Sequence, residues 1–137
     1  MADNVTSQTI LDGERLFIGK YTNISDGTGE TAVVKVDVST LNPNSFGLAC
    51  NGVKINKIWM TVHGMEVRIL WDADVNLLAW QATSNGPYLM DFSSFGGIPN
   101  NSGAGKNGDI AFSTHDASAG DSYTIVLECL KTYATSN

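Results

Sequence analysis

The histidines and cysteines are the side chains of this chain best suited to bind a transition metal. They are His63, His115, Cys50 and Cys129. Zinc sites usually take their ligands from close pairs such as Cys-x2-Cys or His-x3-His, and none of the four forms one. We therefore expect no metal and no other cofactor. The two cysteines are far apart and are expected to be free thiols, with Cys129 in the core.

Carboxylate pairs occur at two places, and each has a structural explanation. Asp72 and Asp74 lie at an expected corner between strands, where aspartate is favoured because it caps nearby amides. Acid–base catalysis would require burial that raises the pKa of one of them, and no neighbouring residue indicates it. Asp26 and Glu30 flank two glycines but lack the spacing of a calcium loop. A cation held between subunits stays an open alternative there.

Gly105-Lys106 superficially resembles the end of a phosphate-binding loop. That motif requires a glycine at position 100 and serine or threonine at position 107, and both positions are asparagine. The serines show no nucleophile-elbow pattern. We predict that the chain is not an enzyme.

Charge excludes two further classes of partner. The 137 residues carry a formal net charge of −6, and only eight are lysine or arginine, dispersed along the chain. Without a basic cluster, binding to nucleic acid is not expected. An acidic domain is also repelled by anionic membranes, and the sequence has neither a signal-like start nor a long apolar run.

Alternating apolar and polar residues predict a domain of strands without a convincing helix. In the segment 31–39, Val34, Val36 and Val38 are predicted to face the core, with Lys35 and Asp37 facing solvent. A turn or short hairpin loop at residues 25–29 precedes this strand. His63-Gly64 is predicted to join two strands as a hairpin, and residues 84–87 form another turn. The expected strands are 14–23, 31–39, 53–62, 65–71, 75–82, 88–92, 109–114 and 122–133.

Strands at this spacing predict a single-domain, all-β, antiparallel β-sandwich of about eight strands with a jelly-roll-like arrangement. A small closed barrel is the alternative fold. We place an N-terminal arm at residues 1–12, the sandwich at 13–133 and a tail at 134–137. The long irregular stretch 93–108 is expected to bind a partner or to be mobile, because compact domains rarely keep such loops otherwise.

Three segments carry a resemblance to a known family. They are SDGTGETAVVKVDVS at 25–39, WMTVHGMEVRILWDADVNLLAW at 59–80, and FSSFGGIPNNSGAGKNGDIAFSTHDASAGDSYTIVLECLK at 92–131. In this order the segments resemble small virion structural proteins of tailed bacteriophages. The resemblance covers most of the chain from about residue 20, whereas LNPNSFGLACNG at 41–52 is less similar.

The resemblance implies a capsid decoration (cement) protein. Such a protein would be made in the host cytoplasm, bind the outer capsid surface and bridge major capsid protein subunits, commonly as a homotrimer. Two alternatives remain: a head–tail connector or tail-associated protein, which would form six- or twelvefold rings, and a carbohydrate-binding sandwich on the virion. The latter would need an exposed aromatic row, drawn from Trp59, Trp71, Trp80, Tyr88, Phe92 and Phe95, although Trp71 lies on the predicted core face.

The expected contact residues fall in three segments. They are Val5, Ile10 and Leu11 in the arm, Asp26 and Thr28 in the glycine-rich turn, and Phe95, Ile98, Asn100 and Lys106 in the long loop. The arm is expected to add a strand to the sheet edge of a neighbouring subunit.

Overall fold

The computed structural model describes residues 4–83 and 88–133, which form nine strands and two short 3-10 turns, with no α-helix among them. The strands are β1 (Asn4–Asp12), β2 (Leu16–Asp26), β3 (Val33–Val36), β4 (Cys50–His63), β5 (Glu66–Trp71), β6 (Leu77–Ala82), β7 (Tyr88–Asp91), β8 (Ile110–His115) and β9 (Ala119–Tyr133). The 3-10 turns are η1 (Val38–Thr40) and η2 (Ser93–Phe95).

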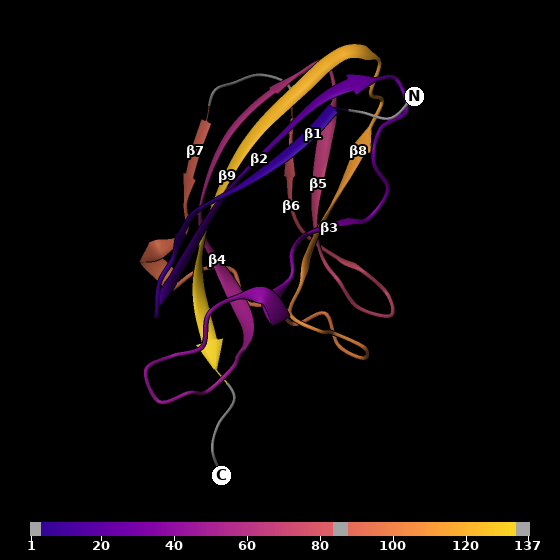
Figure 1. Ribbon diagram of the computed structural model, residues 1–137. Coiled ribbons are helices and arrows are strands. Elements are labelled where there is room, and N and C mark those ends of the chain that lie inside the picture. Colours follow the sequence, from indigo (N-terminus) through magenta and orange to yellow (C-terminus); the bar gives the residue numbers. More distant parts are fainter. Residues whose placement is uncertain (1–3, 84–87, 134–137) are drawn as a thin grey trace.

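The strands build two antiparallel sheets that pack face to face (Figure 1). The five-stranded sheet has the order β1-β2-β9-β4-β7, and the four-stranded sheet has the order β3-β8-β5-β6. The predicted all-β antiparallel sandwich is therefore confirmed, and the closed barrel is not what forms.

The strand order is that of a jelly roll with one strand added. Four antiparallel pairs, β2 with β9, β3 with β8, β4 with β7 and β5 with β6, describe a long two-stranded ribbon. The ribbon is folded so that successive pairs alternate between the sheets, and β4 with β9 and β5 with β8 join its turns. Two packed four-stranded sheets connected in this way are a jelly roll, and β1 extends one of them.

The predicted hairpin around His63-Gly64 is wrong. β4 belongs to the five-stranded sheet and β5 to the four-stranded sheet, so the chain crosses between layers at this turn. Val62 and Met65 are both buried on either side of Gly64, which has φ of 78°. β2 and β3 likewise lie in different sheets. Alternation identifies the buried face of a strand, but it does not identify the hydrogen-bonded neighbour.

The N-terminus also differs from the prediction. Residues 4–12, predicted as part of an arm, form β1, which pairs along β2 from Asn4 opposite Ile24 to Asp12 opposite Phe17. Val5, Thr6, Thr9 and Ile10 are β-branched and favour extended backbone, and β2 offers them a free edge. The predicted tail at 134–137 and the predicted turn at 84–87 lie outside the described residues.

The core lies between the two sheets and follows the predicted alternation in β5 and β9. Met65, Val67, Ile69 and Trp71 are buried, as are Tyr123, Ile125, Leu127 and Cys129. Phe112 on β8 packs edge-on against Tyr21 at 5.6 Å and against Tyr123 at 5.7 Å between ring centroids. These contacts link the two layers.

In the segment 31–39 the predicted alternation holds at Val36, Asp37 and Val38, since both valines are buried and Asp37 is exposed, but it fails at Val34 and Lys35. A register shift between Val34 and Val36 leaves Lys35 as an extra residue opposite β8. Val34 is 43% exposed, whereas the Lys35 side chain is 3% exposed. A β-bulge re-aims side chains in this way, so the lysine predicted to face solvent points into the protein.

Candidate interaction surfaces

β1 is the most exposed strand of the sandwich. Every residue from Asn4 to Leu11 is exposed, on both faces of the strand. Val5, Ile10 and Leu11, predicted as contact residues, are 37%, 52% and 42% exposed. The cause is its position: β1 is an outermost strand of the five-stranded sheet and pairs with β2 alone among the described strands. β1 is thus held to the domain mainly through its pairing with β2.

The outward face of the five-stranded sheet continues from β1 with a row of threonines. Thr6, Thr22, Thr124 and Thr61 lie side by side on β1, β2, β9 and β4. The hydroxyls of Thr6 and Thr22 are hydrogen-bonded. A row of four threonines therefore crosses most of this face without any charge.

A second row on the same face is partly apolar. Trp59, which is 37% exposed, pairs with Val126 on one side and with Leu89 on the other. Leu89 is 52% exposed. Val126 in turn is opposite Lys20, which is opposite Gln8 of β1. Trp59 and Leu89 therefore form a small exposed apolar patch on this face.

Lys57 and Glu128 on this face are balanced by neighbours of opposite sign, whereas Lys20 lies between Gln8 and Val126 in the strand register. Lys57 lies between Glu128 and Asp91 in the strand register. Glu128 also accepts a hydrogen bond from Asn56 at 2.7 Å. Hydrogen bonds from Ser93 hold the pKa of Asp91 below its usual range. Such paired charges do not prevent contact with another subunit.

The predicted contact turn with Asp26 and Thr28 is a crossover between sheets. Asp26 accepts a hydrogen bond from the Thr28 amide at 3.0 Å, which tightens the turn. Beyond it, the amides of Glu30 and Ala32 donate to the hydroxyls of Thr114 and Ser113 at 2.8 and 2.7 Å. Thr28 is exposed, but the segment is fastened to β8.

The predicted contact residues of the long loop separate into two groups. Phe95, at the end of η2, is 66% exposed and lies 6.1 Å from the Phe92 ring. Ile98 instead forms a bridge with Ile55 of β4 and packs against the core. Ile98 therefore has a structural role, whereas Phe95 is available for contact.

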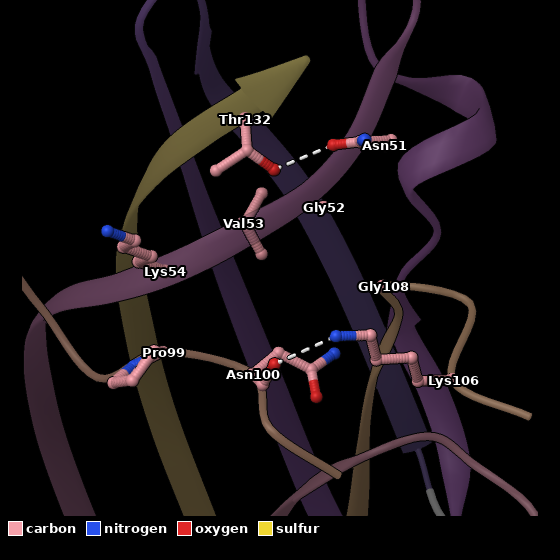
Figure 2. Close-up of a pocket in the computed structure, with 9 residues that line it drawn as sticks. All are labelled: Asn51, Gly52, Val53, Lys54, Pro99, Asn100, Lys106, Gly108 and Thr132. Carbon is pink, nitrogen blue, oxygen red and sulfur yellow. Dashed lines mark hydrogen bonds between the residues drawn. The ribbon is translucent and has the colours of Figure 1, made fainter. Parts of the chain in front are cut away.

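Asn100 and Lys106 line a cavity of about 300 Å3 between the start of β4, the end of β9 and the long loop (Figure 2). Lys106 Nζ donates to the Asn100 carbonyl at 3.3 Å, and Thr132 donates to Asn51 at 2.8 Å (Figure 2). The lining is mixed: five residues are polar or charged, and Val53, Pro99 and two glycines complete it. The loop thus brings two predicted residues together in a small cavity of mixed polarity.

The aspartates considered for catalysis hold the long loop. Asp72 Oδ2 accepts from Asn107 at 3.0 Å, and the Asp74 amide donates to the Ala104 carbonyl at 3.1 Å. A side chain at Gly105 would meet Asp74 at 2.0 Å. Both aspartates therefore have a structural role in this fold.

One group of metal-ligating side chains among the described residues is formed by Glu66, His115 and Asp116, whose ligand atoms lie within 4.8 Å of one another. All three are exposed or half-buried, and exposed acidic groups commonly lie this close without an ion. Cys50 and Cys129 are both buried free thiols, and burial raises the pKa of Cys129.

A buried charged cluster was not predicted from the sequence. Glu30 is 8% exposed and accepts hydrogen bonds from Asn23 at 2.9 Å, Tyr123 at 2.6 Å and Lys35 at 2.5 Å. The Lys35 ammonium lies 6.0 Å from the centre of the Phe112 ring. In the sequence, the signal for this cluster was that Glu30 and Lys35 flank the residues TAVV. The alternating pattern instead predicted that Lys35 lies on the solvent-exposed face of its strand.

Trp71 is 1% exposed, so its predicted core position is confirmed. Trp80 packs edge-on against Phe92, with ring centroids 5.1 Å apart. Trp59 and Tyr88 are exposed on β4 and β7. No helix in the described part of the chain is long and apolar enough to cross a membrane.

Comparisons with protein-family models, with curated proteins and with solved structures found no match to this chain.

Proposed function

We propose that this protein is a non-enzymatic bacteriophage structural protein that decorates the outer capsid shell and bridges major capsid protein subunits. The observation that carries the proposal is β1, which is exposed on both faces and continuous with the uncharged threonine row on the outward face of the five-stranded sheet. The resemblance of the three sequence segments to small virion proteins supplies the virion setting.

The proposed contact surface is the threonine row together with Trp59, Leu89 and the exposed residues of β1. An uncharged, partly apolar patch of this kind can be desolvated at low cost, as the centre of a protein interface requires. A specific interface buries roughly 800 Å² on each partner. Many copies bound to one lattice would resist internal pressure even if each contact were modest.

The charge of the chain supports an outer location. With a net charge of −6, the protein is repelled by packaged nucleic acid rather than attracted to it. A location on the outside of the shell avoids that repulsion. The capsid surface it meets would be recognised through apolar and hydroxyl groups of the five-stranded sheet, not through a strongly charged patch.

The test is co-sedimentation of the purified protein with undecorated shells, followed by osmotic shock of the decorated shells. Wild-type protein is expected to sediment with the shells and to reduce their rupture. Thr61→Lys places a charge in the threonine row and should weaken binding. Leu78→Lys, at a position that is also exposed but lies on the other sheet, is the control and should bind normally.

Failure of the wild-type protein to bind shells would overturn the proposal. Equal loss of binding by both variants would show that the contact surface is assigned wrongly. A six- or twelvefold ring that ignores the shells would instead favour the connector or tail alternative.

A further inference from the structure

We propose that β1 is also a self-association edge, at which two copies of the chain pair β1 with β1 in antiparallel fashion about a two-fold axis. The two five-stranded sheets would then form one continuous sheet. This inference goes beyond the capsid role and does not depend on it.

The open side of β1 is the first observation. β1 is an outermost strand of its sheet, pairs with β2 alone among the described strands, and is nine residues long. An unpaired strand edge presents backbone donors and acceptors that another strand can satisfy. Natural proteins usually guard such edges with charges, bulges, prolines or very short strands.

The other three edge strands have more of these protective features than β1. β3 has four residues, a bulge and the inward-pointing Lys35. β7 has four residues and ends at the exposed Asp91. β6 has six residues and a register shift against β5. β1 has eight successive uncharged residues, Asn4 to Leu11. Its register shift against β2 lies near the end of the strand, between Thr9 and Leu11.

Charge indicates why a second copy fits this edge. Two chains of net charge −6 repel each other, so they associate best where neither presents a charge. The first acidic residue after this run, Asp12, is already paired with the buried ammonium of Lys131. The β1 edge is therefore a neutral strip on an acidic protein.

Symmetry limits the pairing. Residues directly opposite each other in an antiparallel pair point to the same face, so the two-fold axis must lie between the two copies of one residue. Placing it at Ser7 keeps Val5–Thr9, the stretch before the shift, in regular register. Val5 then faces Thr9 of the second copy, Thr6 faces Gln8, and Ser7 faces Ser7. Every such pair is uncharged and suits an extended ladder.

This symmetry makes a sharp prediction about mass. One edge that pairs with itself forms an isologous, two-fold contact, so light scattering over a concentration series should show a dimer or a multiple of a dimer. The trimer that the sequence resemblance implies contains an odd number of copies. A monomer at every concentration, or a trimer, would overturn the inference.

Two variants test the edge directly. Ser7→Lys places two lysines opposite each other and should weaken association roughly tenfold. Val33→Lys adds the same charge at an exposed position on the guarded β3 edge and should leave association unchanged. Ser7 is exposed, so circular dichroism should show that both variants stay folded. Equal masses for Ser7→Lys and wild type would overturn the inference.

A cysteine at the axis gives a second readout. Ser7→Cys should form a disulfide-linked dimer under mild oxidation, since opposite β-carbons in a strand pair lie close to disulfide distance. Thr61→Cys, exposed on a central strand, is the control and should not cross-link. Cys50 and Cys129 are buried and do not compete. No cross-link from Ser7→Cys would overturn the proposed pairing.

The outcomes separate this inference from the capsid role. A wild-type dimer that ignores the shells would overturn the proposed function and support the inference. A monomer that binds the shells would do the reverse.

Discussion

β1 and β3 are the edge strands on the same side of the sandwich, but they differ in length, regularity and charge. Residues of both strands line one groove of about 140 Å3 between the two sheets, among them Thr9 from β1 and Lys35 from β3. β3 is short, bulged and has a lysine buried against Glu30. β1 is long, uncharged and exposed on both faces.

This difference indicates that the two edges have different roles. β3 offers only four residues, and its bulge at Lys35 interrupts the ladder that a further strand would need. β3 therefore closes the four-stranded sheet. β1 has no bulge between Asn4 and Thr9, and a partner strand could extend the sheet there. The predictions below test whether β3 belongs to the stable core while β1 does not.

The largest effect is expected from breaking the buried pair behind β3. Lys35→Met leaves the Glu30 carboxylate without its cation in a buried site, which should lower the free energy of unfolding by about 3–5 kcal/mol. Urea denaturation measures this. Val34→Thr, at the exposed neighbouring position, is the control and should change stability little.

The double variant Lys35→Met/Glu30→Gln sharpens the same test. It removes both charges but keeps an acceptor for Asn23 and Tyr123, so it should be more stable than Lys35→Met alone. If Lys35→Met unfolded no more easily than wild type, the buried pair would not explain the stability of this edge.

A smaller loss is expected where β1 is fastened at its end. Asp12 pairs with Lys131 and accepts from the Asn42 amide at 3.1 Å. Asp12→Asn leaves the Lys131 ammonium, whose side chain is 0% exposed, with weaker acceptors. We expect a loss of about 1.5–3 kcal/mol by urea denaturation. Glu14→Gln, at a nearby exposed carboxylate, is the control. If Asp12→Asn lowered the free energy of unfolding no more than Glu14→Gln does, this role of Asp12 would be contradicted.

A still smaller, pH-dependent effect is expected from Asp109, which accepts from the Val38 amide at 2.9 Å and so holds the chain after β3. Burial raises the pKa of Asp109 above its usual value. The folded protein then binds this proton more tightly than the unfolded chain, so wild type should lose stability as the pH rises from about 3.9 through the folded pKa.

Asp109→Asn removes this titration. The difference in unfolding free energy between Asp109→Asn and wild type should therefore change across that pH window and be constant above it. Urea denaturation at several pH values measures the difference. A difference that stayed constant throughout the window would contradict the raised pKa.

The smallest effects are expected along β1 itself. Val5→Ala and Ile10→Ala should each change the free energy of unfolding by no more than about 0.5 kcal/mol, because both side chains are exposed. Ile125→Ala on β9 in the same sheet should cost about 2–5 kcal/mol, because that side chain is 0% exposed. Comparable losses at Val5 and Ile125 would show that β1 is part of the core.

Much of the fold was predictable because alternation reports burial directly. The pattern in β5 and β9 identified Met65 to Trp71 and Tyr123 to Cys129 as core strands, and both proved buried. The contact residues were less predictable. Asn100 and Lys106 lie together because the loop returns over β4, whereas Ile98 is used to pack that loop.

By itself, the sequence determined the fold class, the core faces of most strands and the acidic charge, since each depends on residue type and local spacing. Only the tertiary structure decided which strands pair, that the chain crosses layers at Gly64, that Lys35 points inward and that β1 is left uncovered. These features depend on contacts between residues far apart in the chain. A local pattern of alternation is the same whichever strand becomes the neighbour.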